Sequence, residues 1–535
     1  MKTYHILSIG LLTASMVLTT SCKDSFLEQE PQTKATLEEY FSTEEHVQEA
    51  VNACYSPIRV YDYYVNSTNQ AMYCPLVFAD VMGDDMLVGA SGPTDQEVWH
   101  LAANYNLSAV NDVWAIWDNS YDGVRAANQA ITYCEQNKET FSPSFLNTSE
   151  EEARVMRAFY YMQLWKWYGN IPYYTNVLGG TDRIEQLDHD AAYEAIITDL
   201  EGAIALNALP LRQSKEENYG RATKALAYMI YAEMVMYQND QARFQTALKY
   251  MQEIINSGEY ALDSDYAHLW SPEGEFGSES IFEVNYINGP TSGRSYPDGG
   301  DPYKSGNYVL GGTILPRVLG PQGGVAADGV DDGWGTFIPR KTAYEQFAAN
   351  DTRRDVSCYV PSAGYTKRYQ DQGMFCGKYV ARTSHTTSDT GGSGDMKYGD
   401  NLRVYRFAET LLNAAELLVR TNGDQTQAKK YLSLVRNRAG LGSAVDPTLD
   451  NIIQERRLEF LGEGKRYWDL VRMEGVSGCT QNASNLLKAD VDKVNDAGDP
   501  GRTNNWTANK KYIPISYLEI SSAEGGLKQN DDYSK

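Results

Sequence analysis

The chain has 535 residues, of which 42% are hydrophobic and 22% charged, a balance that predicts a sizeable folded core and excludes a disordered chain. Its formal charge of −24 and the lack of any basic run exclude a general nucleic-acid binder, since little would neutralise the phosphates. The aromatic residues include 39 Tyr against 14 Phe and 9 Trp, and Tyr combines an apolar ring with a polar tip, which favours wide polar ligand surfaces.

The chain begins with a segment typical of a lipoprotein signal peptide, residues 1–21. Its apolar run, Ile6 to Val17, is too short to span a bilayer and is followed by small residues and then Cys22. We expect cleavage before Cys22, lipid on that thiol, and a tether at 22–35 leading into the fold. An ordinary signal peptide is the alternative, because Thr19 stands where such signals usually have Leu.

Residues 36–535 are predicted to form a single domain that is mainly α-helical. Apolar residues at helical spacing predict two helix–turn–helix units, at 220–257 and 403–438, each about 35 residues long with Ala-rich contact faces. This pattern resembles tetratricopeptide-like packing, with helical pairs as a scaffold. Further helices are expected at 36–56, 111–133, 149–168, 190–206 and 449–472.

A region of different composition lies at about 258–400. Gly, Ser, Asp and Pro cluster there, and we expect only short strands, such as Ser280 to Ile287 and Cys376 to Val380. The stretch 58–110 is similar in character. Because long loops on a rigid frame are usually functional when ordered, the ligand site is expected in these loops.

Six cysteines remain after Cys22, and none has CxxC spacing. Cys358 and Cys376 flank a short segment and are the candidate disulfide; buried free thiols are the alternative. The full set is Cys54, Cys74, Cys134, Cys358, Cys376 and Cys479.

Nothing in the sequence points to an enzyme. No GxSxG, HExxH or P-loop motif occurs, and six His offer little material for acid–base or zinc chemistry. Glycoside hydrolysis needs only two suitably spaced carboxylates, and a chain with 71 acidic residues always offers such pairs, so their abundance decides nothing.

Near the C-terminus, residues 452–472 read IIQERRLEFLGEGKRYWDLVR, with ER, a further E, EG-x-R and DL-x-R in order. With this motif the chain resembles the SusD/RagB family, the surface lipoproteins of starch-utilisation-type glycan import systems. Supporting matches in the same order are the helix Arg154 to Tyr168 with the following GNIP, the strand ESIFEV at 279–284, YRFAE at 405–409, VRNRAGL at 435–441 and YIPI at 512–515.

The resemblance implies a mostly helical fold with tetratricopeptide-like pairs, anchored to the outer membrane and facing the cell exterior. It implies a non-catalytic protein that binds oligosaccharides and passes them to a SusC-like TonB-dependent transporter. Peptide capture by the same architecture is the alternative that the family allows, and a surface glycoside hydrolase is the alternative from another class.

The C-terminal motif itself is predicted to be scaffold. Glu455 and Glu459 are one helical turn apart, as are Arg456 and Phe460. The alternating Glu and Arg predict a lattice of ion pairs that locks this helix to its neighbours, with Trp468 packed beneath.

Candidate ligand residues are aromatic and polar side chains in the loop-rich stretches, since neutral sugars offer apolar ring faces and hydroxyls. Trp99 lies in a polar setting, where the resemblance places a ligand-stacking aromatic, and the sequence leaves open whether its ring is such a platform or part of the core. The full set is Asp80, Asp84, Trp99, Tyr286, Tyr296 and Trp334.

Two acidic loops are candidate Ca²⁺ sites, because carboxylate oxygens suit this ion. Neither loop has EF-hand spacing, and solvated surface loops are the alternative. No other cofactor is expected. The first loop holds Asp328, Asp331 and Asp332, and the second Asp490, Asp492, Asn495 and Asp496.

Overall fold

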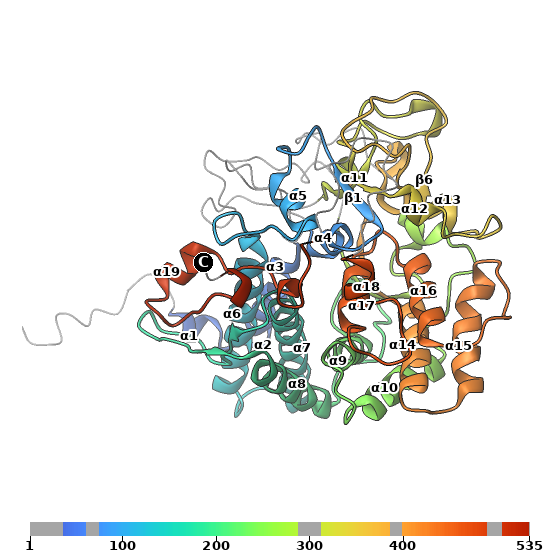
Figure 1. Ribbon diagram of the computed structural model, residues 1–535. Helices are drawn as coiled ribbons and strands as arrows, with labels where there is room; N and C mark the ends of the chain where they lie inside the picture. The colour runs from blue at the N-terminus through green and yellow to red at the C-terminus, as the bar shows by residue number, and fades with distance from the viewer. Residues whose placement is uncertain (1–35, 60–73, 287–311, 386–397, 489–504, 534–535) are drawn as a thin grey trace, which may run out of the picture.

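The computed structural model describes residues 36–59, 74–286, 312–385, 398–488 and 505–533 (Figure 1). Cys22, Tyr296 and the loop with Asp490 lie outside the described residues, as does the signal segment. Within the described ranges, no helix has the length and apolar character that crossing a membrane requires.

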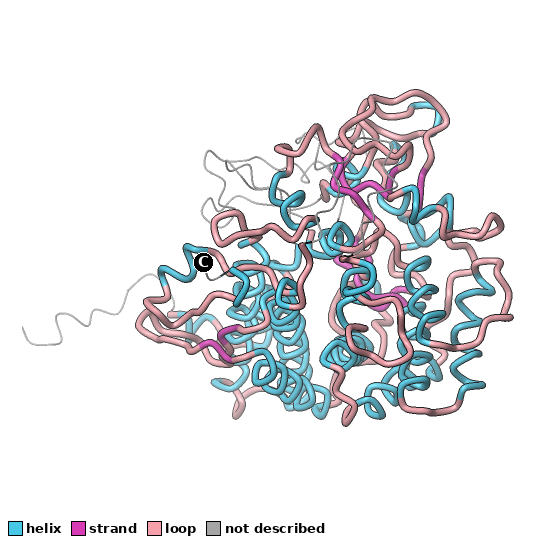
Figure 2. Tube along the Cα trace, in the orientation of Figure 1, coloured by secondary structure: helices cyan, strands magenta, loops and turns pink. Residues whose placement is uncertain are grey.

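Long helices form the lower body of the molecule, and the loop-rich segments lie above them (Figures 1 and 2). Each long helix packs on its neighbour in the chain, so that the tetratricopeptide-like scaffold predicted from the sequence is confirmed. The long helices are α6 (Trp114–Gln136), α7 (Pro143–Tyr168), α8 (His189–Leu206), α9 (Lys224–Gln238), α10 (Phe244–Ser257), α14 (Phe407–Arg420), α15 (Gln425–Arg438) and α16 (Leu449–Glu459).

Polar capping side chains begin several of these helices, and residues in the left-handed backbone conformation end some of them. Thr223 begins α9 by accepting a hydrogen bond from the Leu226 amide, and Asn239 ends it with φ of 59°. Asp424 caps α15 in the same way as Thr223 caps α9. The predicted helix at 449–472 is instead broken after Glu459, because Gly462 and Gly464 adopt φ of 82° and 72°, which a helix does not permit.

The shorter helices lie at the edges of this body and in the upper layer. The predicted helix at 36–56 is divided in the structure. The segment α1 ends at Tyr40, and α2 begins after Thr43, whose side chain caps it. The short helices are α1 (Leu37–Tyr40), α2 (Glu44–Ala53), α3 (Ser56–Arg59), α4 (Pro75–Met82), α5 (Glu97–Ala103), α11 (Leu315–Leu319), α12 (Lys341–Tyr344), α13 (Arg354–Ser357), α17 (Arg466–Arg472), α18 (Ala483–Leu486) and α19 (Tyr517–Ser522).

The strands are short, as the sequence predicted for the loop-rich region, and they form antiparallel pairs. The predicted strand at 376–380 is wrong beyond its first residue, since Gly377–Tyr379 turns as a 3₁₀ helix. The pairs are β1 (Met86–Gly89) with β5 (Thr336–Pro339), β2 (Ile171–Pro172) with β3 (Gln186–Leu187), β4 (Ser280–Val284) with β8 (Leu402–Arg406), and β6 (Cys358–Tyr359) with β7 (Phe375–Cys376).

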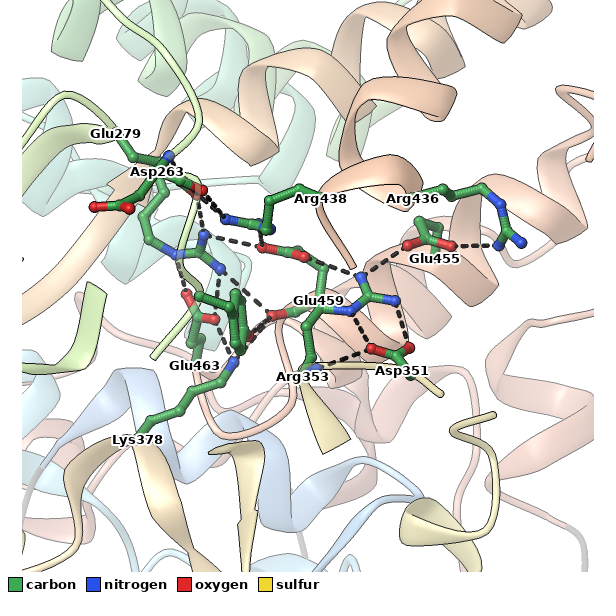
Figure 3. Close-up of polar contacts among 12 residues, drawn as sticks. Asp263, Glu279, Asp351, Arg353, Lys378, Arg436, Arg438, Glu455, Glu459 and Glu463 are labelled. Carbon is green, nitrogen blue, oxygen red and sulfur yellow. Dashed lines mark hydrogen bonds and ion pairs between the residues drawn. The ribbon is translucent and has the colours of Figure 1, made fainter. Parts of the chain in front are cut away.

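A buried lattice of ion pairs joins the helical body to the loop-rich region (Figure 3). It confirms the prediction that the C-terminal motif is scaffold, since the motif supplies three of its carboxylates. The lattice holds as many cations as carboxylates. Its members come mainly from α15, α16, β8 and the segment 351–378. Its members are Arg353, Lys378, Arg406, Arg436 and Arg438 on one side, and Glu279, Asp351, Glu455, Glu459 and Glu463 on the other.

Glu459 is the centre of the lattice. Its carboxylate lies 2.5 Å from Arg438, 3.0 Å from Arg406 and 3.0 Å from Arg353, and its side chain is fully buried. Burial by itself would raise the pKa of Glu459, but the three guanidinium groups outweigh it and hold this pKa below its ordinary value. The carboxylate is therefore charged in the folded protein, and three elements far apart in the sequence depend on it.

We predict that Glu459→Gln lowers the free energy of unfolding by about 3–5 kcal/mol, because it leaves buried guanidinium groups with one partner fewer. Urea unfolding followed by circular dichroism measures this change. The matched control is Lys429→Ala, which removes an exposed pair with Asp446 and is expected to cost less than about 1 kcal/mol. Equal, small losses in both variants would refute the central role of Glu459.

Candidate ligand-binding site

The acidic residues predicted to bind ligand are instead tied to the C-terminal motif. Asp84 forms an ion pair with Arg466 at 2.7 Å, and Asp85 pairs with Arg457. Asp80 accepts a hydrogen bond from the Gly464 amide at 2.9 Å. Both predicted residues, Asp80 and Asp84, are buried, so the structure assigns them to the joint between α4, β1 and the motif rather than to a ligand surface.

Asp80 has an unusual electrostatic setting within that joint. Burial raises the pKa of this carboxyl to about 8, and the nearby charges of Asp85 and Glu463 add to the effect, against the Gly464 hydrogen bond and Lys378. Its second oxygen has no hydrogen bond with another described residue. Asp80 is therefore protonated at neutral pH.

Trp99 lies in the core. Its side chain is 1% exposed, and its ring meets that of Phe337 edge-on, with centroids 4.7 Å apart. Of the two alternatives that the sequence left open, this geometry favours packing, because a ring so enclosed offers no open face to a sugar.

The described aromatic candidates of the loop-rich region do not come together at one ligand site. Tyr286 is buried, with its amide bonded to the Asn401 side chain at 2.9 Å. Trp334 is half-buried against the main core. Since Tyr296 lies outside the described residues, its predicted role stays a prediction.

The three aspartates of the first candidate Ca²⁺ loop point to different partners. Asp328 accepts hydrogen bonds from Tyr359 and Ser362, Asp331 accepts one from Tyr398, and Asp332 forms an ion pair with Arg317 at 2.9 Å. In the described part of the chain, no group of three or more His, Cys, Asp or Glu side chains is placed to hold a metal ion. The structure therefore does not assemble the predicted site in this loop.

The predicted Cys358–Cys376 bridge is not formed, although the two residues are direct partners in the β6–β7 pair. All six cysteines after residue 53 are buried free thiols, which was the alternative expectation. Burial raises the pKa of the Cys358 thiol well above its ordinary value, which keeps it protonated and unreactive.

A surface groove of about 380 Å³ lies where the loop before α9 meets β4 and the end of α2. We call it the Tyr219 groove. Its volume falls in the range of small-molecule sites. It is lined by Asn52, Tyr55, Ile58, Glu217, Tyr219, Gly220, Arg221 and the segment 282–285.

An aromatic shelf forms one wall of this groove. Tyr219 is 37% exposed, and its ring lies 5.3 Å from that of Phe276 with a tilt of 33°. Phe276 has φ of 51°, a left-handed conformation that costs a bulky residue about 1–2 kcal/mol. Arg212 holds it there by donating to the Phe276 and Gly277 carbonyls at 3.1 and 2.7 Å. Strain maintained by specific contacts beside an open ring is typical of a binding site.

Planar polar groups line the same groove. Arg221 donates to the Asn52 side chain at 2.7 Å and to Glu152 at 2.8 Å, which fixes the guanidinium at the groove while leaving it partly exposed. Asn52, Asn285 and Glu217 are exposed beside it. An open ring with amide, guanidinium and carboxylate groups around it matches the apolar faces and hydroxyls of a neutral sugar.

Sequence reasoning missed this groove, because its parts come from residues 52–58, 212–221 and 276–285. The one local signal is the Tyr-Gly pair at 219–220, an aromatic residue in a turn directly before a helix. The loop-rich region contributes Phe276 and the segment 282–285, but Tyr219 stands on a loop of the helical body.

Two family models match the chain over most of its length. The model described as the SusD family matches residues 350–533, and one described as starch-binding associating with outer membrane matches residues 25–236.

Solved structures resemble the chain along almost all of it. Surface glycan-binding protein A from Bacteroides thetaiotaomicron, in complex with laminarihexaose, is 41% identical, with 91% of this chain and 99% of that chain covered and a TM-score of 0.79. A laminarin-binding SusD-like protein is 25% identical, with 92% and 100% covered and a TM-score of 0.77. A curated relative, SusD-like protein P2 of Formosa agariphila, is 26% identical over 89% of this chain and 91% of its own length. The chain belongs to the SusD/RagB family.

We predict that Trp99→Ala lowers the free energy of unfolding by about 3–5 kcal/mol, because it leaves a large cavity beside Phe337. Thermal and urea unfolding measure the change. Tyr219→Ala, at an exposed ring, is the control and is expected to stay within about 0.5 kcal/mol of the wild type. A fully stable Trp99 variant would return this ring to the list of candidate platforms.

We predict that Asp80→Asn removes a pH dependence of stability. The pKa of Asp80 in the folded protein is about 8, above its ordinary value of 3.8. Between these two pH values the folded protein therefore keeps a proton on Asp80 that the unfolded chain has lost. The contribution of Asp80 is fully present below about pH 4 and is lost as the pH rises towards 8. The stability of the variant relative to the wild type is therefore expected to improve between pH 5 and pH 8 in urea titrations. Parallel profiles would contradict the raised pKa.

Proposed function

We propose that this protein is a non-catalytic surface lipoprotein that binds a neutral β-glucan of the laminarin type and delivers it to a TonB-dependent transporter. The observation that carries the proposal is the likeness, at 41% identity along 91% of the chain, to a glycan-binding protein in complex with laminarihexaose. The Tyr219 groove supports it, because an open aromatic shelf beside planar polar groups suits an uncharged sugar chain.

The strength of binding that such a groove can supply fits this role. A dissociation constant between about 1 mM and tens of micromolar corresponds to roughly −4 to −6 kcal/mol, which a stacked ring and a few hydrogen bonds provide. Because a polysaccharide offers many equivalent segments near one cell surface, repeated weak contacts add up to firm capture while each segment is still released easily.

The soluble chain without residues 1–22 is expected to be retarded in native gels that contain laminarin. Gels with starch, with a β-1,6-glucan and with no polysaccharide separate the sugar classes. The supernatant of a prolonged incubation with laminarin is expected to contain no new reducing ends. Release of sugar would establish a hydrolase instead, and retardation by none of the glycans would refute the glycan proposal and favour peptide ligands.

We predict that Tyr219→Ala weakens laminarin binding at least tenfold, because about 1.4 kcal/mol is lost with the stacking ring. Isothermal titration calorimetry with laminarihexaose measures the change. Tyr517→Ala is the matched control, since Tyr517 is another exposed tyrosine, 58% accessible, on α19 and away from the groove. Equal affinities for the two variants would place the glycan site elsewhere.

We predict that Cys22→Ala leaves the full chain without lipid and releases it from the outer membrane. Several acyl chains, at about 0.8 kcal/mol per buried methylene, make such an anchor effectively permanent. Membrane fractionation and surface proteolysis of the wild type and variant measure the difference. Unchanged membrane association of the variant would contradict the anchor.

A further inference from the structure

A second cavity, of about 470 Å³, opens where α19 lies over the beginning of α6. It is separate from the Tyr219 groove, with which it shares no lining residue. In Figure 1, α19 lies at the left edge of the molecule, beside the start of α6. The Tyr517 amide donates to the Ala109 carbonyl at 2.7 Å, which fixes the start of α19 to the loop before α6.

Apolar side chains on both sides of this cavity are left in water. Val110 is 73% exposed, Tyr517 58% and Leu518 72%, and α19 has no buried residue. Burying a large apolar side chain is favourable, and several exposed ones around one cavity mark a surface that another molecule covers. We call Val110, Tyr517, Leu518 and the half-buried Asp118 the α19 pocket.

Asp118 supplies the charge at this pocket. It is half-buried on α6 and forms no hydrogen bond or ion pair with another residue in the described ranges. The ionisable groups that act on it are the carboxyls of Glu519 on α19, Asp112 in the preceding loop and Asp122 on α6. Burial, followed by these three carboxyls, raises the pKa of Asp118 to about 7. The nearby cation Arg125 is already paired with Asp122 at 2.7 Å.

A carboxylate so placed is stabilised by an incoming cation. The apolar rim suits the aliphatic stem of Arg or Lys and a neighbouring apolar side chain, and the carboxyl suits the charged end. The acidic surroundings and the chain's net charge of −24 oppose an anionic lipid surface. Among the described residues that line it, none has a side-chain amide or guanidinium for sugar hydroxyls, unlike the Tyr219 groove.

We propose that the α19 pocket is a docking point for a protein partner, which inserts an Arg or Lys side chain beside an apolar residue to pair with Asp118. The inference rests on the proposed function in one respect, since it takes the transporter to be that partner. A stable interface buries more than about 1,000 Å², so the pocket is one anchoring point within a larger contact.

The first test uses N-acetylarginine amide as the probe and the folded soluble chain, followed by protein NMR. Wild-type protein is expected to bind it with a millimolar dissociation constant that improves several-fold from pH 6 to pH 8, as Asp118 ionises. Asp118→Asn is expected to lose this binding at least fivefold and to lose its pH dependence, while Glu345→Gln, a change at an exposed acid directly after α12, is expected to bind as the wild type does. No binding to the wild type, or undiminished binding to Asp118→Asn, would overturn the pocket.

The second test uses the full lipidated chain in its own outer membrane, with the transporter identified by mass spectrometry after gentle solubilisation. Asp118→Asn and Leu518→Ser are expected to reduce the recovered transporter at least tenfold. Leu434→Ser, at a residue 40% exposed on α15, is the control and is expected to reduce nothing. Full recovery with both pocket variants would overturn the docking point.

Two further outcomes separate this inference from the proposed function. If the wild type recovers no transporter although laminarin binds, the partner assignment fails and glycan capture stands. If the soluble chain sediments with phosphatidylcholine vesicles and Leu518→Ser abolishes this, the pocket is a membrane contact and the protein-partner proposal is wrong.

Discussion

The buried carboxylate of Glu459 is the contact on which the fold depends most. It faces Arg353, Arg406 and Arg438, which come from the loop-rich region, from β8 and from α15. A buried charged group is stable only when oppositely charged groups pair with it. Each arginine therefore fixes the position of its own segment relative to α16. The lattice thereby joins α15, α16 and β8 to the segment 351–378 of the loop-rich region.

A frame of this kind explains why ligand contacts can lie on loops without loss of geometry. Arg212 holds Phe276, whose ring lies beside that of Tyr219, and Arg221 is fixed at the groove by its pair with the buried Glu152. Phe276 keeps a strained conformation because the Arg212 hydrogen bonds to the Phe276 and Gly277 carbonyls offset its cost. The α19 pocket is built differently, with apolar groups and the carboxyls of Asp112, Asp118 and Glu519. We therefore propose different kinds of molecule for the two sites: an uncharged sugar in one and a cationic protein segment in the other.

The features predicted from the sequence depend on interactions between residues close in the chain, and those that it did not predict depend on residues far apart in the chain. The helices around 220–257 and 403–438 were predicted well, because apolar spacing and caps such as Thr223 and Asp424 act within one turn. The role of the Glu and Arg residues in the motif was predicted because their density admits few other arrangements. The sequence left open whether Trp99 is core and offered Asp84 as a ligand contact, since a polar sequence neighbourhood gave no sign of Phe337 or Arg466, more than 200 residues away in the chain. Tyr219 was missed for the same reason.

The sequence by itself determined the class of fold, the helical pairs, the scaffold motif and the family, because periodic burial and a long ordered motif are properties of neighbouring residues. Only the tertiary structure decided which charged and aromatic side chains are buried and which line a surface. Asp80, Asp118 and Asp328 are alike in the sequence, yet one is a buried protonated acid, one lies in an open pocket and one holds a loop through Tyr359 and Ser362. Their roles depend on desolvation and on partners brought together by folding, and neither quantity is local in the chain.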